Sequence, residues 1–295
     1  MTPLNRFKHR VKLWLQWLGY KLVYWSYPPY RTPYRLPIQL VTGKKVIPAI
    51  IPDLDVRVAD TLQETYDQQY ESTISEWRKI GAVGKAANIQ NLCQRNNLNP
   101  YSVLEVGAGD GNVLAEIARL GIGSAHYAAE ISKSGVLKIQ EQNIPTLIEV
   151  FLFNGYQLPF ADQSFDLVIL SHVLEHVEHP RLLLREIVRV SQFQILEIPL
   201  DDVPGVDQRS EALTSYGHID VYTPARFRFL LHTEFITLID DLLNISSEAV
   251  VLFGNANNAQ KSLAYRKRLK RFQNVTEWER ERLSESYTVL TSKHL

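Results

Sequence analysis

Between residues 102 and 200, short apolar runs alternate with amphipathic stretches. Short apolar runs of this kind indicate strands. The stretches between them repeat their apolar positions with a helical period and predict helices at 111–120, 132–142 and 174–190. Such alternation is typical of a parallel sheet covered by helices on both faces. The predicted strands are 103–106, 125–131, 148–153, 167–170 and 193–198.

Outside this region the pattern is less regular. The stretch 61–96 is predicted to be helical, as is 223–235, which two apolar runs at 236–243 and 249–253 follow. A basic helix is expected over 261–271, which holds six Lys or Arg and no acid, and a solvated face is the favoured interpretation of its charges. A polar tail closes the chain.

Apolar side chains in the first 25 residues repeat with helical spacing and form one stripe. Lys12, Gln16 and Lys21 interrupt it, so it is too polar to cross a membrane, and no small-residue cleavage site follows. Three interpretations remain open: a helix docked on its own domain, which we favour, an interfacial helix on a membrane, and a nucleic-acid arm. Prolines then predict an extended connector over 26–50. The stripe consists of Phe7, Val11, Trp14, Leu15, Leu18, Leu22 and Trp25.

The composition, 45% hydrophobic and 22% charged, is that of a globular protein with a core. The single cysteine, Cys93, excludes an internal disulfide and a cysteine zinc cluster and fits a reducing compartment, so we expect a cytoplasmic protein. The net charge is zero, but nine of the 32 Lys and Arg lie in residues 1–50, which hold no acid; this leaves 23 bases against 32 acids elsewhere. A basic arm on an acidic body indicates an anionic partner.

Three alternating glycines, Gly107, Gly109 and Gly111, follow the first predicted strand. The first permits a sharp turn, and the second lets the backbone approach a ligand without a Cβ in the way. Asn112 occupies the sixth position of the loop, where dinucleotide-binding enzymes carry a small residue. Glu105, at the end of the strand, would repel a pyrophosphate but attract a cation such as the ammonium of a methionine moiety. The loop therefore argues against a nicotinamide enzyme.

Together with the residues that follow, this loop resembles that of the class I S-adenosylmethionine-dependent methyltransferases. Residues 158–168 (LPFADQSFDLV) and 171–177 (SHVLEHV) are similar to the LPF…D.SFDLV…HVLEHV signature of the group that methylates small molecules. Residues 217–219 (GHI) and 222–224 (YTP) look like the turn that opens a late helix in many of these enzymes. The resemblance, over 75–245, implies S-adenosylmethionine as the cofactor. It also implies a doubly wound, Rossmann-like α/β fold with a mostly parallel seven-stranded sheet, helices on both faces and, here, a helical N-terminal extension.

The resemblance also implies cofactor roles, position by position. An acid ends the second predicted strand 19 residues after Gly111, and this spacing fits a carboxylate that holds both ribose hydroxyls. Near the adenine amino group the family usually has an aspartate, where this chain has Asn154, whose amide oxygen can still accept that hydrogen bond. The implied set is Glu105, Gly107 and Gly109 at the methionine end, Glu130 at the ribose, Asn154 at the adenine, and Leu170 and Ser171 facing the methyl-transfer site.

Methyl transfer from a sulfonium is an in-line displacement, so positioning supplies most of the acceleration. An alcohol or amine acceptor also needs a base, and candidates lie beyond the carboxyl ends of the strands. They are His172, His218, Asp201 and Asp202. We favour His218, because a loop histidine is poised near neutral pH; a capping or packing role is the competing interpretation for both histidines.

Residues 172–176 (HVLEH) also match a zinc-binding H-x-x-E-H pattern. Two histidines four apart on a helix could bind a metal ion. However, the segment lies where the methyltransferase signature places it, and no paired acidic ligand motif follows. We therefore expect no metal.

The pattern W-R-x-x-G-A-x-x-K-A-x-N-I at 77–89 resembles bacterial methyltransferases of cell-surface glycan and glycolipid pathways. We therefore expect a small-molecule, glycan or lipid-linked acceptor and no nucleic-acid partner. If the N-terminal helix does not dock on its own domain, residues 7–25 are expected to contact the inner face of an anionic membrane. The alternative is a catalytically silent module that binds the cofactor and recruits partners through the arm. The predicted organisation is a basic aromatic arm at 1–50, a helical cap region at 51–100, the cofactor-binding domain at 101–255 and a helical polar tail at 256–295.

Overall fold

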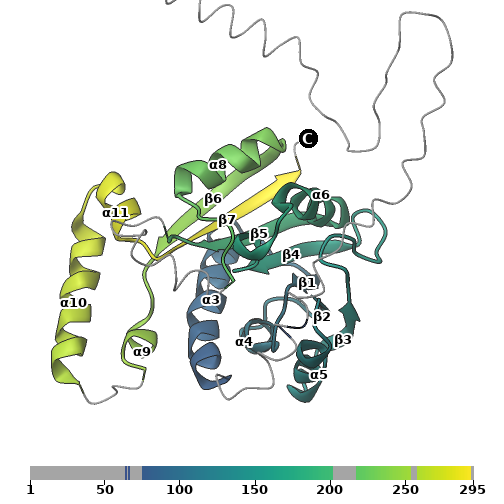
Figure 1. Ribbon diagram of the computed structural model, residues 1–295, viewed down its shortest axis with the longest axis horizontal. Helices are drawn as coiled ribbons and strands as arrows, with labels where there is room; N and C mark the ends of the chain where they lie inside the picture. The colour runs from purple at the N-terminus through teal and green to yellow at the C-terminus, as the bar shows by residue number, and fades with distance from the viewer. Residues whose placement is uncertain (1–63, 65, 67–74, 202–216, 254–257, 294–295) are drawn as a thin grey trace, which may run out of the picture. The chain divides into compact units, whose positions relative to one another are not determined.

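The computed structural model of the chain describes residues 64 and 66 and the ranges 75–201, 217–253 and 258–293 (Figure 1). The expected N-terminal helix, the connector after it and the candidate base Asp202 lie outside these residues. Within the described ranges, no helix is both long enough and apolar enough to span a membrane.

The described residues form one sheet of seven strands. These are β1 (Ser102–Val106), β2 (Ala125–Glu130), β3 (Leu147–Leu152), β4 (Phe165–Ser171), β5 (Ser191–Pro199), β6 (Ile236–Asn244) and β7 (Ser286–Lys293). Their order across the sheet is β3-β2-β1-β4-β5-β7-β6 (Figure 1). The first five strands pair in parallel, whereas β7 is antiparallel to both β5 and β6. The expected mostly parallel, seven-stranded, doubly wound sheet is confirmed.

Helices cover both faces of this sheet, as expected (Figure 1). On one face lie α3 (Ser75–Arg95), α4 (Asn112–Arg119) and α5 (Lys133–Glu141), and on the other lie α6 (Pro180–Val190) and α8 (Pro224–Thr233). Buried side chains of α3 and α4, including Ile89, Leu92 and Ile117, form one cluster with Leu167 and Ile169 of β4. The helix expected before residue 100 is present as α3 and packs directly on the sheet, and the boundary of a separate cap region stays a prediction.

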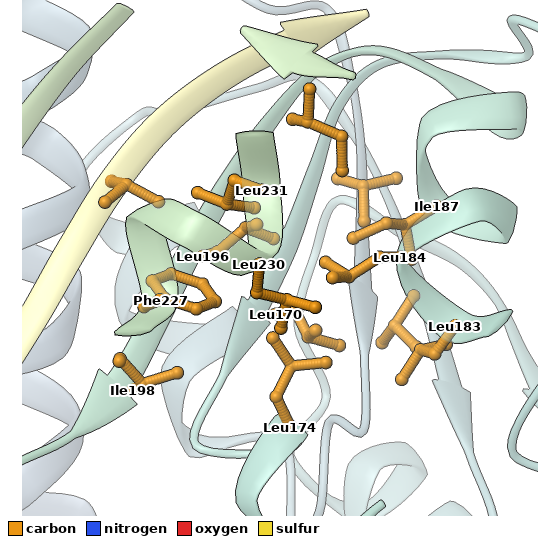
Figure 2. Packing of buried hydrophobic residues seen from close by; sticks show 14 of the residues in the cluster. Leu170, Leu174, Leu183, Leu184, Ile187, Leu196, Ile198, Phe227, Leu230 and Leu231 are labelled. Carbon is orange, nitrogen blue, oxygen red and sulfur yellow. The ribbon is translucent and has the colours of Figure 1, made fainter. Parts of the chain in front are cut away.

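A second cluster holds α6 and α8 against the sheet (Figure 2). The apolar positions of α6 repeat with helical spacing, so they face the strands together. Each fully buried leucine stabilises the fold by about 1.5–3 kcal/mol relative to its exposed state. Figure 2 shows Leu183, Leu184 and Ile187 of α6 and Phe227, Leu230 and Leu231 of α8 around Leu170, Leu196 and Ile198 of β4 and β5.

The helix expected over 174–190 is confirmed for 180–190 only, because the chain breaks before Pro180. A short 3-10 helix, η1 (Leu174–His176), follows β4, and α6 starts only at Pro180. Proline disfavours helical backbone at the residue before it, and His179 has φ −122° and ψ 64°. The break separates the segment after β4 from the helix that packs on the sheet.

The expected helical polar tail at 256–295 is wrong over Ser286–Lys293, which is a strand. After β6 come α9 (Glu248–Val251), α10 (Ala259–Asn274) and α11 (Glu277–Leu283), and then β7 enters the sheet between β5 and β6. Thr288 and Thr291 are fully buried there, and Thr291 donates a hydrogen bond of 3.0 Å to Gln194. The basic helix expected over 261–271 is confirmed as α10, and none of its side chains is buried.

The strand order determines where a ligand can bind. β1 and β4 are neighbours at the centre, and the chain leaves β1 toward β2 and β3 but leaves β4 toward β5. In open parallel sheets, ligands bind beyond the carboxyl ends of the strands at the point where the order reverses. The glycine loop follows β1 and His172 follows β4, so both lie at this point.

Candidate active site

The glycine loop between β1 and α4 has left-handed backbone at each of its three glycines. Their φ values are +69° at Gly107, +58° at Gly109 and +78° at Gly111, where residues with a Cβ are strained. A Cβ on Gly107 would lie 2.5 Å from a methyl group of Val173, and one on Gly111 would lie 3.2 Å from Ile139. The loop is therefore glycine-rich because of its turn and because two neighbouring segments approach it closely.

Glu130 ends β2 with its carboxylate on this loop. The residue is 2% exposed, and Oε2 accepts a hydrogen bond of 2.8 Å from the amide of Gly109. Oε1 accepts from the amide and the hydroxyl of Ser132, at 3.0 and 2.8 Å. Burial raises the pKa of Glu130, and these hydrogen bonds oppose the rise because they stabilise the charged form. Glu130 thereby ties the loop to Ser132, the N-cap of α5.

Glu105, near the end of β1, is the second buried carboxyl beside the loop, also 2% exposed. Its Oε2 has no hydrogen-bond partner among the described residues. Burial raises the pKa of Glu105 to about 8; Lys85 of α3 opposes this rise, and Asp110 and Glu130 add to it. Because an unpartnered buried carboxyl is costly, Glu105 is suited to a cationic group that a ligand brings.

Asn154 follows β3 and closes a turn with its own side chain. Its Oδ1 accepts hydrogen bonds from the amides of Tyr156 and Gln157, at 3.0 and 2.8 Å. The amide oxygen that was expected to accept from an adenine amino group is thus already occupied within the chain. Its Nδ2 makes one long hydrogen bond of 3.4 Å to Gln157, so this conformation favours a donor role. Contact of Asn154 with adenine stays a prediction.

The last two residues of β4 have different surroundings. The side chain of Leu170 is fully buried in the cluster of Figure 2, and contact of this residue with the transfer site stays a prediction. Ser171 donates a hydrogen bond of 2.8 Å to Glu197 of β5. The same carboxylate accepts from Asn88 of α3 and Ser286 of β7, each at 3.0 Å. Ser171 is therefore part of a polar network between strands, and its contact with a ligand stays a prediction.

His172 comes directly after β4 with a left-handed φ of +56°. Residues other than glycine seldom adopt this conformation, and they recur at functional sites. The amide of His172 donates a hydrogen bond of 2.9 Å to the carbonyl of Glu197, and Nδ1 lies 3.7 Å from Oε1 of Glu175. Burial lowers the pKa of His172 well below its ordinary value, and nearby positive charges lower it further. A ring held neutral in this way is a weak base.

His218 reaches the same end of the sheet from the segment before α8. Its Nδ1 lies 2.8 Å from Oδ2 of Asp201, which follows β5, and its ring centroid lies 4.8 Å from that of His176. Burial alone would lower the pKa of His218, but the hydrogen bond to Asp201 and the charge of Glu175 raise it above its ordinary value. Because the carboxylate accepts the Nδ1 proton, the lone pair of the neutral ring lies on Nε2. Two of the sequence candidates, His218 and Asp201, are therefore in direct contact.

Four residues near this site were not assigned a role from sequence. Glu175 and His176 belong to the H-x-x-E-H pattern at 172–176, which marks both as possible metal ligands. Tyr66 lies edge-on to His176 with ring centroids 5.9 Å apart, and burial and the charges of Glu175 and Glu130 raise its pKa. The charge of Lys85 lowers the pKa of both Glu175 and Glu105. Lys85 is the lysine of the pattern at 77–89, which gave it no role at this site, and for Tyr66 the local sequence holds no comparable signal.

Comparison with known proteins gives one family and several relatives. Residues 104–192, from β1 into β5, match the family described as "Methyltransferase domain". Demethylmenaquinone methyltransferase of Porphyromonas gingivalis is 30% identical over 96 residues, which are 31% of this chain and 39% of that protein. A ubiquinone/menaquinone biosynthesis C-methyltransferase of Bartonella tribocorum is 30% identical over 120 residues, 38% of this chain and 46% of that protein. The chain thus spans less than half the length of these curated relatives.

Solved structures share the fold at low sequence identity. Magnesium protoporphyrin IX methyltransferase of Synechocystis, solved with bound SAH, has a TM-score of 0.52 at 12% identity and covers 79% of this chain and 98% of its own. The [4+2]-cyclase SpnF has a TM-score of 0.53 at 13% identity, and the match covers 79% of this chain and 94% of SpnF. Since one of the two is named a cyclase, the fold by itself does not fix the reaction. The family match adds what the fold leaves open: residues 104–192 match a methyltransferase domain.

Proposed function

We propose that this protein transfers the methyl group of S-adenosylmethionine to an acceptor bound at the carboxyl ends of β4 and β5. The observation that carries the proposal is the pair of buried carboxyls on the two sides of the glycine loop, Glu105 and Glu130. The cofactor has an ammonium and a ribose diol, and these are groups that carboxylates bind. The residues present therefore fit the cofactor.

Each residue then has a defined part in holding the cofactor. Glu105 attracts the ammonium, which supplies the partner that its Oε2 lacks within the described residues. Glu130 holds the ribose hydroxyls, and Gly109 admits the ligand to the backbone of the loop. Asn154 donates through Nδ2 to the adenine. When bound, the cofactor supplies a methyl group on a positively charged sulfur, which a nucleophile displaces in line.

On the acceptor side, we propose His218 as the residue that acts on the acceptor and Asp201 as its positioning residue. The hydrogen bond of 2.8 Å between them fixes both the ring orientation and the tautomer. The reactive atom of His218 is then Nε2, whether it takes a proton or binds an electrophile. His172 is the poorer candidate, because its lowered pKa weakens it as a base.

The acceptor that we propose is a small molecule, either lipid-linked or a glycan. The basic aromatic arm at 1–50 and the pattern at 77–89 both favour a lipid-linked or glycolipid acceptor. Two curated relatives are named for menaquinone or ubiquinone chemistry, which is also that of lipid-linked molecules. The arm would then place the protein on an anionic membrane surface.

Calorimetric titration with S-adenosylmethionine and S-adenosylhomocysteine tests the first half of the proposal. Saturable binding that is lost in Gly109→Arg and weakened in Glu105→Gln is expected, whereas a His232→Ala variant on α8 should bind like the parent chain. Absence of binding to either ligand would overturn the proposal. Release of S-adenosylhomocysteine with glycolipid, glycan or quinone extracts tests the second half, and binding without turnover would favour a silent cofactor-binding module.

A further inference from the structure

Three side chains with metal-binding atoms meet at the carboxyl ends of β4 and β5. Glu175 and His176 belong to η1, directly after β4, and His218 belongs to the segment before α8. One ligand atom from each lies within 4.8 Å of the others. The two segments are joined because the amides of Ile219 and Asp220 donate hydrogen bonds of 2.8 and 3.1 Å to the carbonyl of Glu175.

The distances within this group suit a shared ion better than direct hydrogen bonds. Oε1 of Glu175 lies 3.7 Å from Nδ1 of His172 and 3.8 Å from Nε2 of His176. Both distances exceed those of a hydrogen bond, about 2.7–3.2 Å. Two ligands of a tetrahedral zinc ion, each about 2.1 Å from the metal, are roughly 3.4 Å apart. The Glu175–His176 pair at 3.8 Å is within a few tenths of an ångström of this spacing, whereas the widest pair of the three ligand atoms, at up to 4.8 Å, would have to close by more than 1 Å on binding an ion.

Glu175 is the member of the group that most needs a partner. Its side chain is fully buried, and neither carboxylate oxygen has a hydrogen-bond partner in the described part of the chain. Buried carboxylates are normally hydrogen-bonded, paired with a cation or bound to a metal. Glu175 is thus an acceptor without a donor, held by the fold beside two imidazole rings.

Hydrogen bonds on the far side of each ring fix the tautomers. Nδ1 of His176 lies 2.9 Å from the carbonyl oxygen of Gly217, which can only accept, so Nδ1 carries the proton. Asp201 holds Nδ1 of His218 in the same way at 2.8 Å. Both neutral rings then carry their lone pair on Nε2. Metal-binding histidines almost always donate their other ring N–H to a carbonyl or a carboxylate, as both do here.

We propose that Glu175, His176 and His218 bind one divalent transition-metal ion, with zinc as the first candidate. Two imidazoles and one carboxylate form the ligand set of catalytic zinc sites that keep a position open. Magnesium and calcium prefer oxygen ligands alone, so this donor set disfavours them. His172, 3.7 Å from Glu175, is within reach as a further ligand.

This proposal departs from the sequence-based expectation of no metal. The H-x-x-E-H pattern supplies only part of the ligand set, and no acidic motif downstream completes it. The missing ligand is His218, which lies 42 residues after His176 and which the fold brings to η1.

The position of the ion suggests its role, and this step rests on the proposed methyl transfer. The ion would lie at the carboxyl ends of the strands, where the acceptor is proposed to bind. Its open coordination position suits an acceptor that carries a hydroxyl group, because a bound divalent ion lowers the pKa of a coordinated oxygen. His218 then acts on the acceptor as a ligand of the ion instead of as a base.

The test is metal binding by the full chain after treatment with a chelator. Titration with Co²⁺, followed by visible absorption, should reach one equivalent with the spectrum of a four- or five-coordinate nitrogen and oxygen site, and Zn²⁺ should displace the cobalt. His176→Ala, His218→Ala and Glu175→Gln should each weaken binding on the order of 100-fold or more. Asp201→Asn should weaken it about 10–100-fold, because the carboxylate that orients the ring of His218 is lost. His232→Ala, an exposed histidine on α8, is the matched control and should bind like the parent chain.

Two outcomes would overturn the metal site. One is the absence of stoichiometric Co²⁺ or Zn²⁺ binding, and the other is equal metal affinity of the His218→Ala and His232→Ala variants. Circular dichroism of each variant shows whether it is folded, and Glu175→Gln keeps the side-chain volume, so a folding defect does not mimic the loss of a ligand. Calorimetry with S-adenosylmethionine on the same samples separates the two proposals. Cofactor binding without metal binding overturns only the metal site, and metal binding without cofactor binding overturns only the methyl transfer.

Discussion

The amide of Gly109 donates a hydrogen bond of 2.8 Å to Oε2 of Glu130, which joins the glycine loop after β1 to the end of β2. Gly135, in the first turn of α5, leaves the space that this contact needs. A Cβ at position 135 would lie 2.6 Å from Oγ of Ser132, 2.8 Å from Cγ of Glu130 and 2.8 Å from the carbonyl oxygen of Gly109. The glycine of α5 is therefore part of the same site, although no motif in the sequence marks it.

Gly135→Ala should consequently displace Glu130 and weaken cofactor binding. We expect a loss of affinity for S-adenosylhomocysteine of about 10-fold, equivalent to roughly 1.4 kcal/mol, and an overpacking cost of about 1–3 kcal/mol in the free energy of unfolding. Calorimetry and urea denaturation measure the two effects. Gly81→Ala in α3 is the control: its Cβ meets nothing within 4 Å, so affinity should hold and the helix should gain up to about 1 kcal/mol. Equal affinities of the two variants would contradict the role of this contact.

Glu105 makes the stability of the ligand-free protein depend on pH. Its pKa is raised from 4.5 to about 8 in the folded state by burial. A group with a raised folded pKa contributes stability that is fully present below its unfolded pKa and is lost as pH rises through the folded value. The parent chain should therefore lose stability between pH 5 and pH 8. Because the Gln side chain does not titrate, the free energy of unfolding of the Glu105→Gln variant should rise relative to that of the parent chain over this range. Urea denaturation at both values tests this; a constant difference would show that Glu105 is ionised throughout.

Ionisation of Glu105 should have the opposite effect on cofactor affinity, which should rise with pH where the stability of the ligand-free protein falls. The ammonium of S-adenosylmethionine favours ionised Glu105, so affinity in the parent chain should rise from pH 6 toward pH 8, near the folded pKa. Glu105→Gln should bind more weakly and with little dependence on pH in this range. Calorimetry in buffers of different ionisation enthalpy should also detect proton release on binding only in the parent chain. Equal pH profiles would place the ammonium elsewhere.

The elements that the sequence predicts are those whose conformation is determined by residues close together in the chain. The five parallel strands were predicted to within two residues at either end, because each is an apolar run between turns. The sharp turn of the glycine loop was predicted, since glycine itself permits the left-handed backbone that the structure has there. The start of α6 at Pro180 was missed although proline, which restricts the residue before it, gives a local signal for it.

The elements that were missed depend on contacts between distant residues. In β7 the polar Thr288 and Thr291 are buried because Asn244 and Gln194 hydrogen-bond to them, from 44 and 97 residues away. The contact of His218 with η1 likewise depends on the docking of Ile219 on Glu175. Neither pairing leaves a periodic signature in the chain, so the sequence pattern does not predict it.

The place of β7 in the sheet predicts how the C-terminal region responds to substitution. Leu290 in β7 is 1% exposed, whereas Leu263 in α10 is 55% exposed. Leu290→Ala should lower the free energy of unfolding by about 2–5 kcal/mol, because it leaves a cavity next to β5. Leu263→Ala, the same change on a solvated helix, should stay within about 0.5 kcal/mol of the parent chain. Thermal or urea unfolding measures both, and similar values would mean that β7 does not belong to the cooperative core.

Deletion of residues 1–25 separates the two main interpretations of the arm, whose predicted helix lies outside the described residues. If the stripe lies on a membrane, the deletion should reduce binding to anionic vesicles, at about 1 kcal/mol for each Lys or Arg near the surface, while cofactor affinity is kept. Added salt should weaken the binding of the full chain, and neutral vesicles should bind it less. The six bases of α10 remain in the shortened chain and serve as an internal control. Unchanged vesicle binding combined with a lower unfolding temperature would instead show that the helix packs on its own domain.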